Sequence, residues 1–281
     1  MTGARASASA DPREREAALL DRLAALRSVI VAYSGGVDSA YLAWAATRAL
    51  GARALAVTAD SPSYPDRHRA MALRIARDFA IPHEIVTTRE LDRPEYRANA
   101  PDRCYHCKHE LYTTLTALAR GRGFAAVADG SNADDRGDYR PGRRAAREFG
   151  VMSPLDDVGL TKRDIRDLSH RAGLPTWDEP ASACLSSRVP YHSEVTPEKL
   201  RAIEQAEEAL RRLGFRVLRV RHHGAVARVE LGRDEMARAV EPDTARAIDR
   251  AIRDAGFQYV ALDLRGYRLG SLNEGIVLQP V

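Results

Sequence analysis

The chain has 281 residues, of which 44% are hydrophobic and 29% charged, and its formal net charge is +4. This is the balance of a folded protein long enough for two domains, and no run of about 18 apolar residues predicts a transmembrane helix. The first 13 residues lack the apolar core of a secretory signal, so we expect a disordered tail and a cytoplasmic protein. Only 6% of residues are aromatic and basic residues alternate with acidic ones, which argues against a nucleic-acid-binding protein.

From residue 14 onward, helical and strand-like segments alternate along the chain. Apolar residues at helical spacing predict helices at 14–27, 40–50, 66–80 and 108–123. Short apolar runs with many β-branched residues predict strands at 28–33, 53–60, 83–88 and 124–130. The alternation predicts an α/β domain with an open parallel sheet over residues 14–178.

The pattern changes after about residue 175. A proline-rich stretch without periodicity leads to Thr196 and Pro197, a helix cap and a first helical residue. Two strand-like arms follow around His223 and Gly224, then further helical segments and a final strand. We therefore predict a smaller α+β domain over residues 179–281, which binds substrate or mediates oligomerisation and includes the loop of Cys184.

The segment "YSGGVDS", residues 33–39, lies between a predicted buried strand and a helix start. Glycines without a Cβ let backbone amides curl around an anion, and the helix N-terminus adds unpaired N–H groups. Asp38 fits a Mg²⁺ ligand or a helix cap, because a free carboxylate would repel phosphate. The residues that we expect to bind the nucleotide here are Ser34, Gly35, Gly36, Asp38 and Ser39.

This segment is neither GxxxxGK[ST] nor GxGxxG, so neither a Walker-type loop nor NAD binding is expected. It resembles the PP-loop of the ATP pyrophosphatase superfamily. The resemblance implies ATP as cosubstrate, pyrophosphate as product and an adenylated intermediate.

A second polar segment follows the fourth predicted strand. Ligands of an open α/β sheet sit outside the carboxyl ends of its strands, which places Gly130, Asn132 and Asp135 at the same rim as residues 33–39. These residues suit an adenine or ribose contact, although a polar surface loop would look alike. Thr58, at the end of another strand, is a further candidate for adenine contact.

Five segments together resemble one family of this superfamily. They are "YSGGVDSAYLAWAA", "DRCYHCK", "DGSNADDRGDYRPG", "LTKRDIRDLSHRAGLPTWDEPASACLSSRVPY" and "RVRHHGAVARVE", and the resemblance runs from about residue 14 to 275. The family is LarE, the ATP-dependent sulfur transferases of nickel-pincer nucleotide biosynthesis, which serve lactate racemase. The resemblance implies adenylation of the carboxylates of pyridinium-3,5-biscarboxylic acid mononucleotide, their conversion to thiocarboxylates, and a homo-oligomer, for which a hexamer is the expected size.

The family uses two sulfur chemistries, and the cysteines of this chain bear on the choice. In one, a single cysteine, here matched by Cys184, gives up its sulfur; in the other, three cysteines hold a [4Fe-4S] cluster that presents a sulfide. This chain has Cys104, Cys107 and Cys184 and no other cysteine. Three thiolates fill three corners of a four-iron cluster and leave one iron open, so we favour the cluster.

Other interpretations of the cysteines stay open at this point. A zinc site could recruit His106 or His109 as its fourth ligand. A redox CxxC could accompany Cys184 as the attacking thiolate. Three unrelated buried cysteines are the least informative alternative.

The substrate carries a phosphate and carboxylates, so cationic groups are expected near Cys184. Arg188 follows it closely, and the resemblance implies that Arg219 and Arg221 bind a phosphate and that Glu230 lies near the site. Arginine suits phosphate because its planar fork donates two parallel hydrogen bonds. Alternating arginines could equally face solvent on a half-buried strand. Glu207 is a further candidate.

Three rival functions remain to be separated from this one. An amidating ligase similar to NAD synthetase would use ammonia, and its cysteines would be incidental. A tRNA-thiolating enzyme should carry an RNA-binding module or a denser basic face. A non-catalytic nucleotide-binding protein would not need Asp38 and Ser39.

Overall fold

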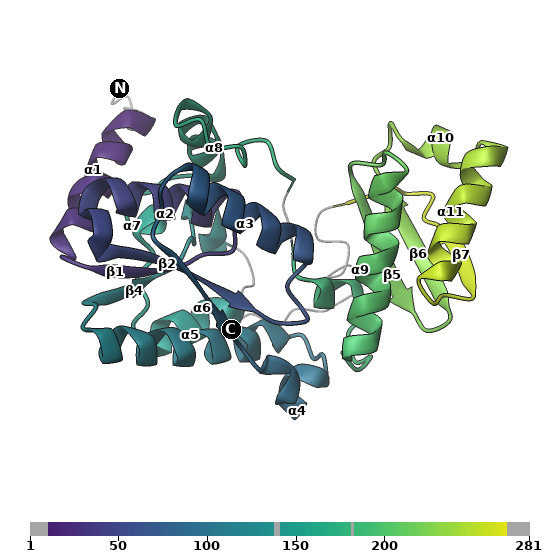
Figure 1. Cartoon of the computed structure of the whole chain (residues 1–281), viewed down its shortest axis with the longest axis horizontal. Helices are drawn as coiled ribbons and strands as arrows, with labels where there is room; N and C mark the ends of the chain where they lie inside the picture. Colours follow the sequence, from purple (N-terminus) through teal and green to yellow (C-terminus); the bar gives the residue numbers. More distant parts are fainter. Residues whose placement is uncertain (1–10, 138–140, 181–182, 269–281) are drawn as a thin grey trace, which may run out of the picture.

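The larger sheet of the protein is parallel throughout (Figure 1). The computed structural model describes residues 11–137, 141–180 and 183–268. Four parallel strands are present, as predicted, and they run in the order β3-β2-β1-β4. Their bounds are β1 Val29–Ala32, β2 Ala54–Asp60, β3 His83–Thr87 and β4 Ala126–Ala128. The prediction of an α/β fold with an open parallel sheet is confirmed.

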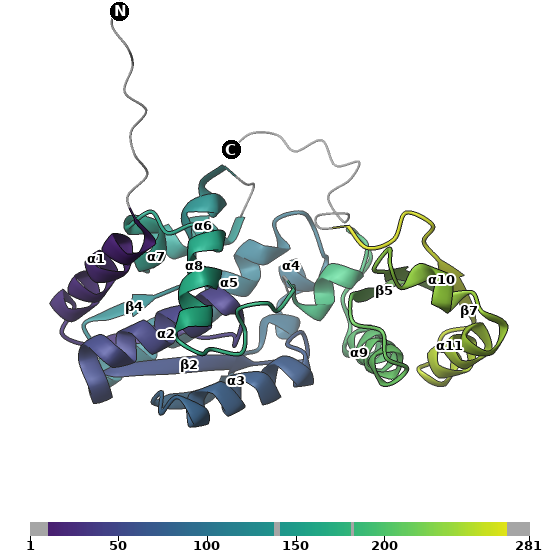
Figure 2. The same ribbon diagram turned by 90° about the horizontal axis from the view of Figure 1, so that it is seen from above.

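Helices cover both faces of this sheet, with α1, α2, α3 and α8 on one side and α5 and α6 on the other (Figures 1 and 2). Alternate residues of β1 enter different hydrophobic clusters: Val29 and Val31 pack with the first group, Ile30 and Ala32 with α5. Strands buried on both faces have to be apolar throughout, which explains their sequence. The helices of this part are α1 Pro12–Ala25, α2 Val37–Leu50, α3 Asp66–Asp78, α4 Pro94–Arg97, α5 Arg103–Arg122, α6 Pro141–Glu148, α7 Pro154–Asp157 and α8 Lys162–Arg171.

Three helix starts differ from the prediction, and that of α2 lies at Val37, three residues before the predicted residue 40. Helix α1 begins at Pro12, inside the predicted tail, because the Asp11 side chain caps it by accepting the Arg13 N–H at 3.0 Å. The rest of that tail, residues 1–10, lies outside the described part of the chain. Helix α5 begins at Arg103, five residues earlier than predicted, so the CxxC pair occupies its first turns.

The C-terminal unit is a three-stranded sheet covered by two long helices. An antiparallel hairpin joins β5 and β6, and β7 pairs with β6 in parallel. Thr196 caps α9 and Pro197 is its first residue, as predicted. The elements are α9 Pro197–Arg212, β5 Leu218–His223, β6 Val226–Leu231, α10 Met236–Ala239, α11 Pro242–Asp254 and β7 Tyr259–Leu262.

The hydrophobic core of the C-terminal unit also takes residues from the first half of the chain. Tyr96 of α4 is fully buried in it, and Leu91 and Cys107 pack against it. The segment before α5 therefore bridges the two sheets, while the predicted boundary at residues 178 and 179 stays a prediction. Within the described ranges, every helix is too short or too polar to cross a bilayer.

Candidate active site

The loop between β1 and α2 is a tight turn held by its serines. Gly35 has a φ of +66°, a conformation that glycine adopts without a Cβ penalty, and Gly36 precedes the first residue of α2. The Ser34 N–H donates to the Ser39 hydroxyl at 3.1 Å, and that hydroxyl donates to the Gly36 carbonyl at 3.1 Å. The N-terminus of α2 thus lies at the carboxyl end of β1, where open α/β sheets bind phosphate.

We expect Gly35→Ala to lower the free energy of unfolding by about 1–2 kcal/mol, the cost of a left-handed conformation for a residue with a Cβ. A Cβ at Gly35 would also lie 2.9 Å from the Ala72 Cβ. Gly121→Ala is the matched control, because Gly121 lies within α5 with nothing inside 4 Å of its added Cβ. Urea denaturation measures both, and equal stability of the two variants would contradict the prediction.

Asp38, in the first turn of α2, forms an ion pair with Lys162 at the start of α8. Burial raises the pKa of Asp38, although the Lys162 ammonium opposes the rise. The other carboxylate oxygen, Oδ1, is buried and has no hydrogen-bond partner in the described part of the chain. A buried carboxylate oxygen without a partner is the kind of group that a cation satisfies.

The predicted rim residues do lie beside this loop. A Cβ on Gly130 would come within 3.0 Å of the Ser39 backbone nitrogen, so only glycine allows the two segments to approach so closely. Asn132 is buried, and its N–H donates to Asp135 Oδ2 at 3.0 Å. Asp135 is also close enough to Asp38 to raise the pKa of that carboxyl.

Thr58 is placed differently from the other rim residues. It is buried, and its hydroxyl donates to the Tyr33 carbonyl at 2.8 Å and lies 2.8 Å from His83 Nε2. This side chain ties the ends of β1, β2 and β3 together. Its contact with adenine stays a prediction.

The three cysteines come from two segments that meet at the N-terminal end of α5. All three are free thiols; Cys104 is exposed, and Cys107 and Cys184 are half-buried. Burial raises the pKa of Cys107 well above its ordinary value, and the charges of Glu90 and Cys184 raise it further. Cys184 precedes a 3-10 turn, Leu185–Arg188, whose first N–H donates to the Ser63 carbonyl at 2.9 Å.

The described part of the chain contains no group of three His, Cys, Asp or Glu side chains gathered tightly enough to hold a single metal ion. The two histidines proposed for zinc have other neighbours: His106 lies 3.6 Å from an Asp102 oxygen, and His109 lies 3.1 Å from an Arg93 nitrogen. The arrangement therefore gives no support to zinc at the cysteines. A four-iron cluster spreads its ligand sulfurs over separate iron atoms and does not need one common centre.

Arg188 is buried and holds the loop of Cys184 in place. Its guanidinium pairs with Glu207 through two hydrogen bonds, at 2.9 and 3.1 Å. It also donates to the carbonyls of Ala183 and Cys184, at 2.6 and 2.8 Å. These contacts give Arg188 and Glu207 a positioning role, and contact of Arg188 with substrate stays a prediction.

Arg221 and Glu230 form a second buried pair, with bonds of 3.0 and 2.9 Å. Arg221 also donates to the Ser187 carbonyl at 2.7 Å, so β5 supports the same loop. Arg219 is half-buried over the Tyr267 ring, and burial together with the charge of Arg188 lowers the pKa of Arg219 to about 10. A guanidinium held near other cations favours an anionic ligand.

A groove of about 910 Å³ lies between the start of α3 and helix α9, with Leu185 and Arg188 among its lining residues. His68 lines it, and burial together with the charges of Arg67, Arg188 and other arginines lowers the pKa of His68 to about 4. At neutral pH this histidine is therefore uncharged in a strongly cationic setting. The Glu204 carboxylate also lines the groove and accepts the Asp66 N–H at 2.6 Å.

Two site residues were missed by reasoning from the sequence. Lys162 follows a capping-box threonine in "LTKRD", so its position at a helix start was readable, but its partner Asp38 is 124 residues away. Arg103 precedes the CxxC and is buried beside the loop of Cys184. A buried arginine directly before a cysteine gives no distinctive local pattern.

No protein-family model matches this chain. Curated relatives are nevertheless similar to it over most of its length. An uncharacterized protein of Synechocystis sp. is 45% identical over 248 residues, covering 88% of this chain and 92% of the relative. Pyridinium-3,5-bisthiocarboxylic acid mononucleotide synthase of Lactiplantibacillus plantarum is 35% identical over 261 residues, covering 92% and 94%. An uncharacterized protein of Methanocaldococcus jannaschii is 28% identical over 242 residues, covering 86% and 91%. The likeness therefore extends over both sheets.

Proposed function

This chain belongs to the LarE family of pyridinium-3,5-bisthiocarboxylic acid mononucleotide synthases, and on that premise we propose that it is an ATP-dependent sulfur transferase of nickel-pincer cofactor biosynthesis. Its substrate is pyridinium-3,5-biscarboxylic acid mononucleotide. The observation that carries the proposal is the meeting of three free thiols at the end of α5 in a chain that also has the phosphate turn.

The proposed reaction has two steps for each carboxylate. A carboxylate oxygen attacks the α-phosphorus of ATP, and pyrophosphate leaves. A sulfur nucleophile then attacks the carbonyl carbon of the acyl-adenylate, and AMP leaves with the former carboxylate oxygen. Two such cycles give the bisthiocarboxylate.

The nucleotide side of the chain suits the first step. The amides of Gly35, Gly36 and the start of α2 would hold the phosphates, and Asp38 would hold Mg²⁺ through its buried, unpartnered Oδ1. Mg²⁺ would neutralise phosphate charge there. Lys162, released from Asp38, would contribute a second positive charge. Gly130, Asn132 and Asp135 would contact the nucleoside.

The cysteine side suits the second step. Cys104, Cys107 and Cys184, three thiols without a fourth, would suit the ligation of a [4Fe-4S] cluster, which would supply sulfide as the nucleophile. The alternative is that Cys184 gives up its own sulfur and that the CxxC pair has a redox role. Free thiols in either role suit a cytoplasmic protein.

The substrate phosphate would be bound on the C-terminal unit. Arg219 is the strongest candidate, because burial and the charge of Arg188 lower its pKa to about 10, so an anion beside it would be favoured. Its neighbours Arg188 and Arg221 form buried pairs with Glu207 and Glu230. Those pairs position the loop of Cys184 from two sides. We propose a homo-oligomer as the working form, a hexamer being the expected size, which light scattering would test.

Anaerobic turnover tests the proposed function. The protein is incubated with the biscarboxylate mononucleotide, ATP, Mg²⁺ and sulfide, and AMP, pyrophosphate and thiocarboxylate are quantified. We expect all three products with this substrate and no tRNA-dependent pyrophosphate release. With ammonia replacing sulfide, adenylation should still release pyrophosphate, but no amide should form. Pyrophosphate release stimulated by tRNA, or an amide product, would overturn the proposal in favour of a rival enzyme.

A further inference from the structure

The turn before α5 and the first residue of α5 carry two buried polar side chains that the chemistry above does not use. Asn99 has no exposed surface, and Arg103 is only 3% exposed. They precede Cys104 and Cys107 in the chain and contact the segment that follows Cys184. Buried polar groups of this kind persist only where their hydrogen bonds are satisfied.

Asn99 binds the segment that follows Cys184 through the nitrogen of its side-chain amide. Its Nδ2 donates to the carbonyls of Val189, Pro190 and Ser193, at 3.2, 2.8 and 3.0 Å. Its backbone carbonyl accepts the His192 N–H at 3.0 Å. Asn99 has a φ of +54°, a left-handed conformation that asparagine tolerates better than most residues.

Arg103 continues the connection toward Cys184. Its Nη1 donates to Asn99 Oδ1 and, at 2.9 Å, to the Ser186 carbonyl. No carboxylate in the described ranges pairs with this guanidinium. The acceptors of Nη1 therefore lie on Asn99 and on the segment that follows Cys184.

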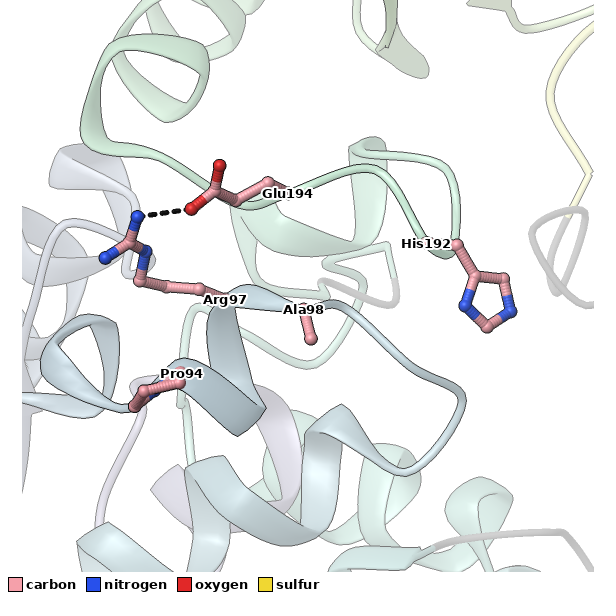
Figure 3. A pocket seen from close by; sticks show the side chains of 5 residues that line it. All are labelled: Pro94, Arg97, Ala98, His192 and Glu194. Atoms are coloured by element: carbon pink, nitrogen blue, oxygen red, sulfur yellow. Dashed lines mark hydrogen bonds and ion pairs between the residues drawn. The ribbon is translucent and has the colours of Figure 1, made fainter.

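The segment before α5 and the segment after Cys184 are also in contact at the protein surface (Figure 3). Arg97 and Glu194 point toward each other and form an ion pair, while His192 points away from them. The Val195 N–H donates to the Arg97 carbonyl at 2.9 Å. An exposed ion pair contributes little, so the buried contacts dominate this junction.

We propose that Asn99 and Arg103 are positioning residues, a buried brace that fixes the distance between the CxxC helix and the loop of Cys184. This inference rests on the proposed function only in that the thiols take part in sulfur transfer. Its geometry is the same whether the cysteines share a cluster or Cys184 acts alone. Without the brace, the two segments would still belong to one fold, but Cys184 would sample positions away from Cys107.

Thiol crosslinking in the iron-free, reduced full-length chain tests the brace. Cys104→Ser leaves Cys107 and Cys184, which dibromobimane joins into a fluorescent product when both lie within its reach. On this background we compare Asn99→Ala, Arg103→Met and the milder Arg103→Lys. Arg120→Met is the matched control, because Arg120 is an exposed residue at the other end of α5. Circular dichroism and thermal melting identify the variants that fold.

We expect the initial rate of crosslinking to fall by about fivefold or more in Asn99→Ala and Arg103→Met, since each loses hydrogen bonds to or from a buried polar group. Arg103→Lys should lie between these and the parent, and Arg120→Met should match the parent. Folded Asn99→Ala and Arg103→Lys proteins that crosslink at the parent rate would overturn the brace. The crosslinking result does not depend on thiocarboxylate formation, so failure of the proposed function would be recognised separately.

Discussion

Cys184→Ser is expected to abolish thiocarboxylate formation while leaving adenylation intact. The phosphate turn and Asp38 belong to α2, whereas Cys184 lies on a loop fixed by Arg188, so the substitution removes the sulfur group without touching the nucleotide contacts. We expect thiocarboxylate formation to fall at least about a hundredfold, as for loss of a covalent nucleophile. Substrate-dependent exchange of pyrophosphate into ATP should stay near the parent rate.

The companion variants Cys104→Ser and Cys107→Ser separate the two sulfur chemistries. If three thiols act together, each of these variants should also lose repeated turnover. If Cys184 alone donates sulfur, both should complete one turnover, and Cys184 should then lose one sulfur and two hydrogens by mass spectrometry. A Cys184→Ser protein that forms thiocarboxylate at the parent rate would contradict both chemistries.

Glu207→Ala should be among the most destabilising substitutions in the C-terminal unit. It leaves the buried Arg188 guanidinium without its carboxylate and removes the acceptor of the Val220 N–H at 3.2 Å. Breaking a buried ion pair in this way costs about 3–5 kcal/mol. Glu208→Ala, one residue along the same helix, is the control: its carboxylate is 45% exposed and should change the free energy of unfolding by less than about 0.5 kcal/mol.

The contribution of Glu207 should also depend on pH. Burial alone would raise the pKa of Glu207, but the charges of Arg188, Arg219 and Arg211 outweigh burial and lower it from 4.5 to about 2. A depressed carboxyl pKa stabilises the fold above the unfolded value and loses this effect as the pH falls through the folded one. In urea titrations the difference between parent and Glu207→Ala should therefore shrink from pH 5 toward about pH 2. A difference that stays constant over this range would argue against the ion pair as its origin.

The sequence predicts those parts of the protein whose local structure is determined by neighbouring residues. Neighbouring residues predict the apolar strands, the glycine turn before α2 and the Thr196 cap, and the structure agrees with each. The predicted start of α5 was wrong. Asp102 is the N-cap residue, but its side chain makes no cap hydrogen bond, so no local pattern indicates Arg103 as the first helical residue.

The contacts that build the site could not be predicted in the same way. Asp38 and Lys162 are 124 residues apart, and Arg103 and Ser186 are 83 apart, so only the folded chain brings them together. Arg188 was predicted as a substrate contact from its type and position, and Arg221 from the family resemblance. Whether an arginine meets solvent, ligand or a buried carboxylate depends on tertiary packing. A single sequence does not encode that choice locally.

The separation of the cysteines along the chain has a consequence for biosynthesis. Cys184 follows Cys107 by about 77 residues, so it leaves the ribosome about 4–15 s later at ordinary synthesis rates. Tyr96 and Leu91, which complete the C-terminal core, are also made well before that core exists. During this interval the CxxC pair has neither Cys184 nor the residues of the C-terminal core beside it. The order of synthesis therefore delays assembly of the predicted three-cysteine site until the C-terminal unit has been made.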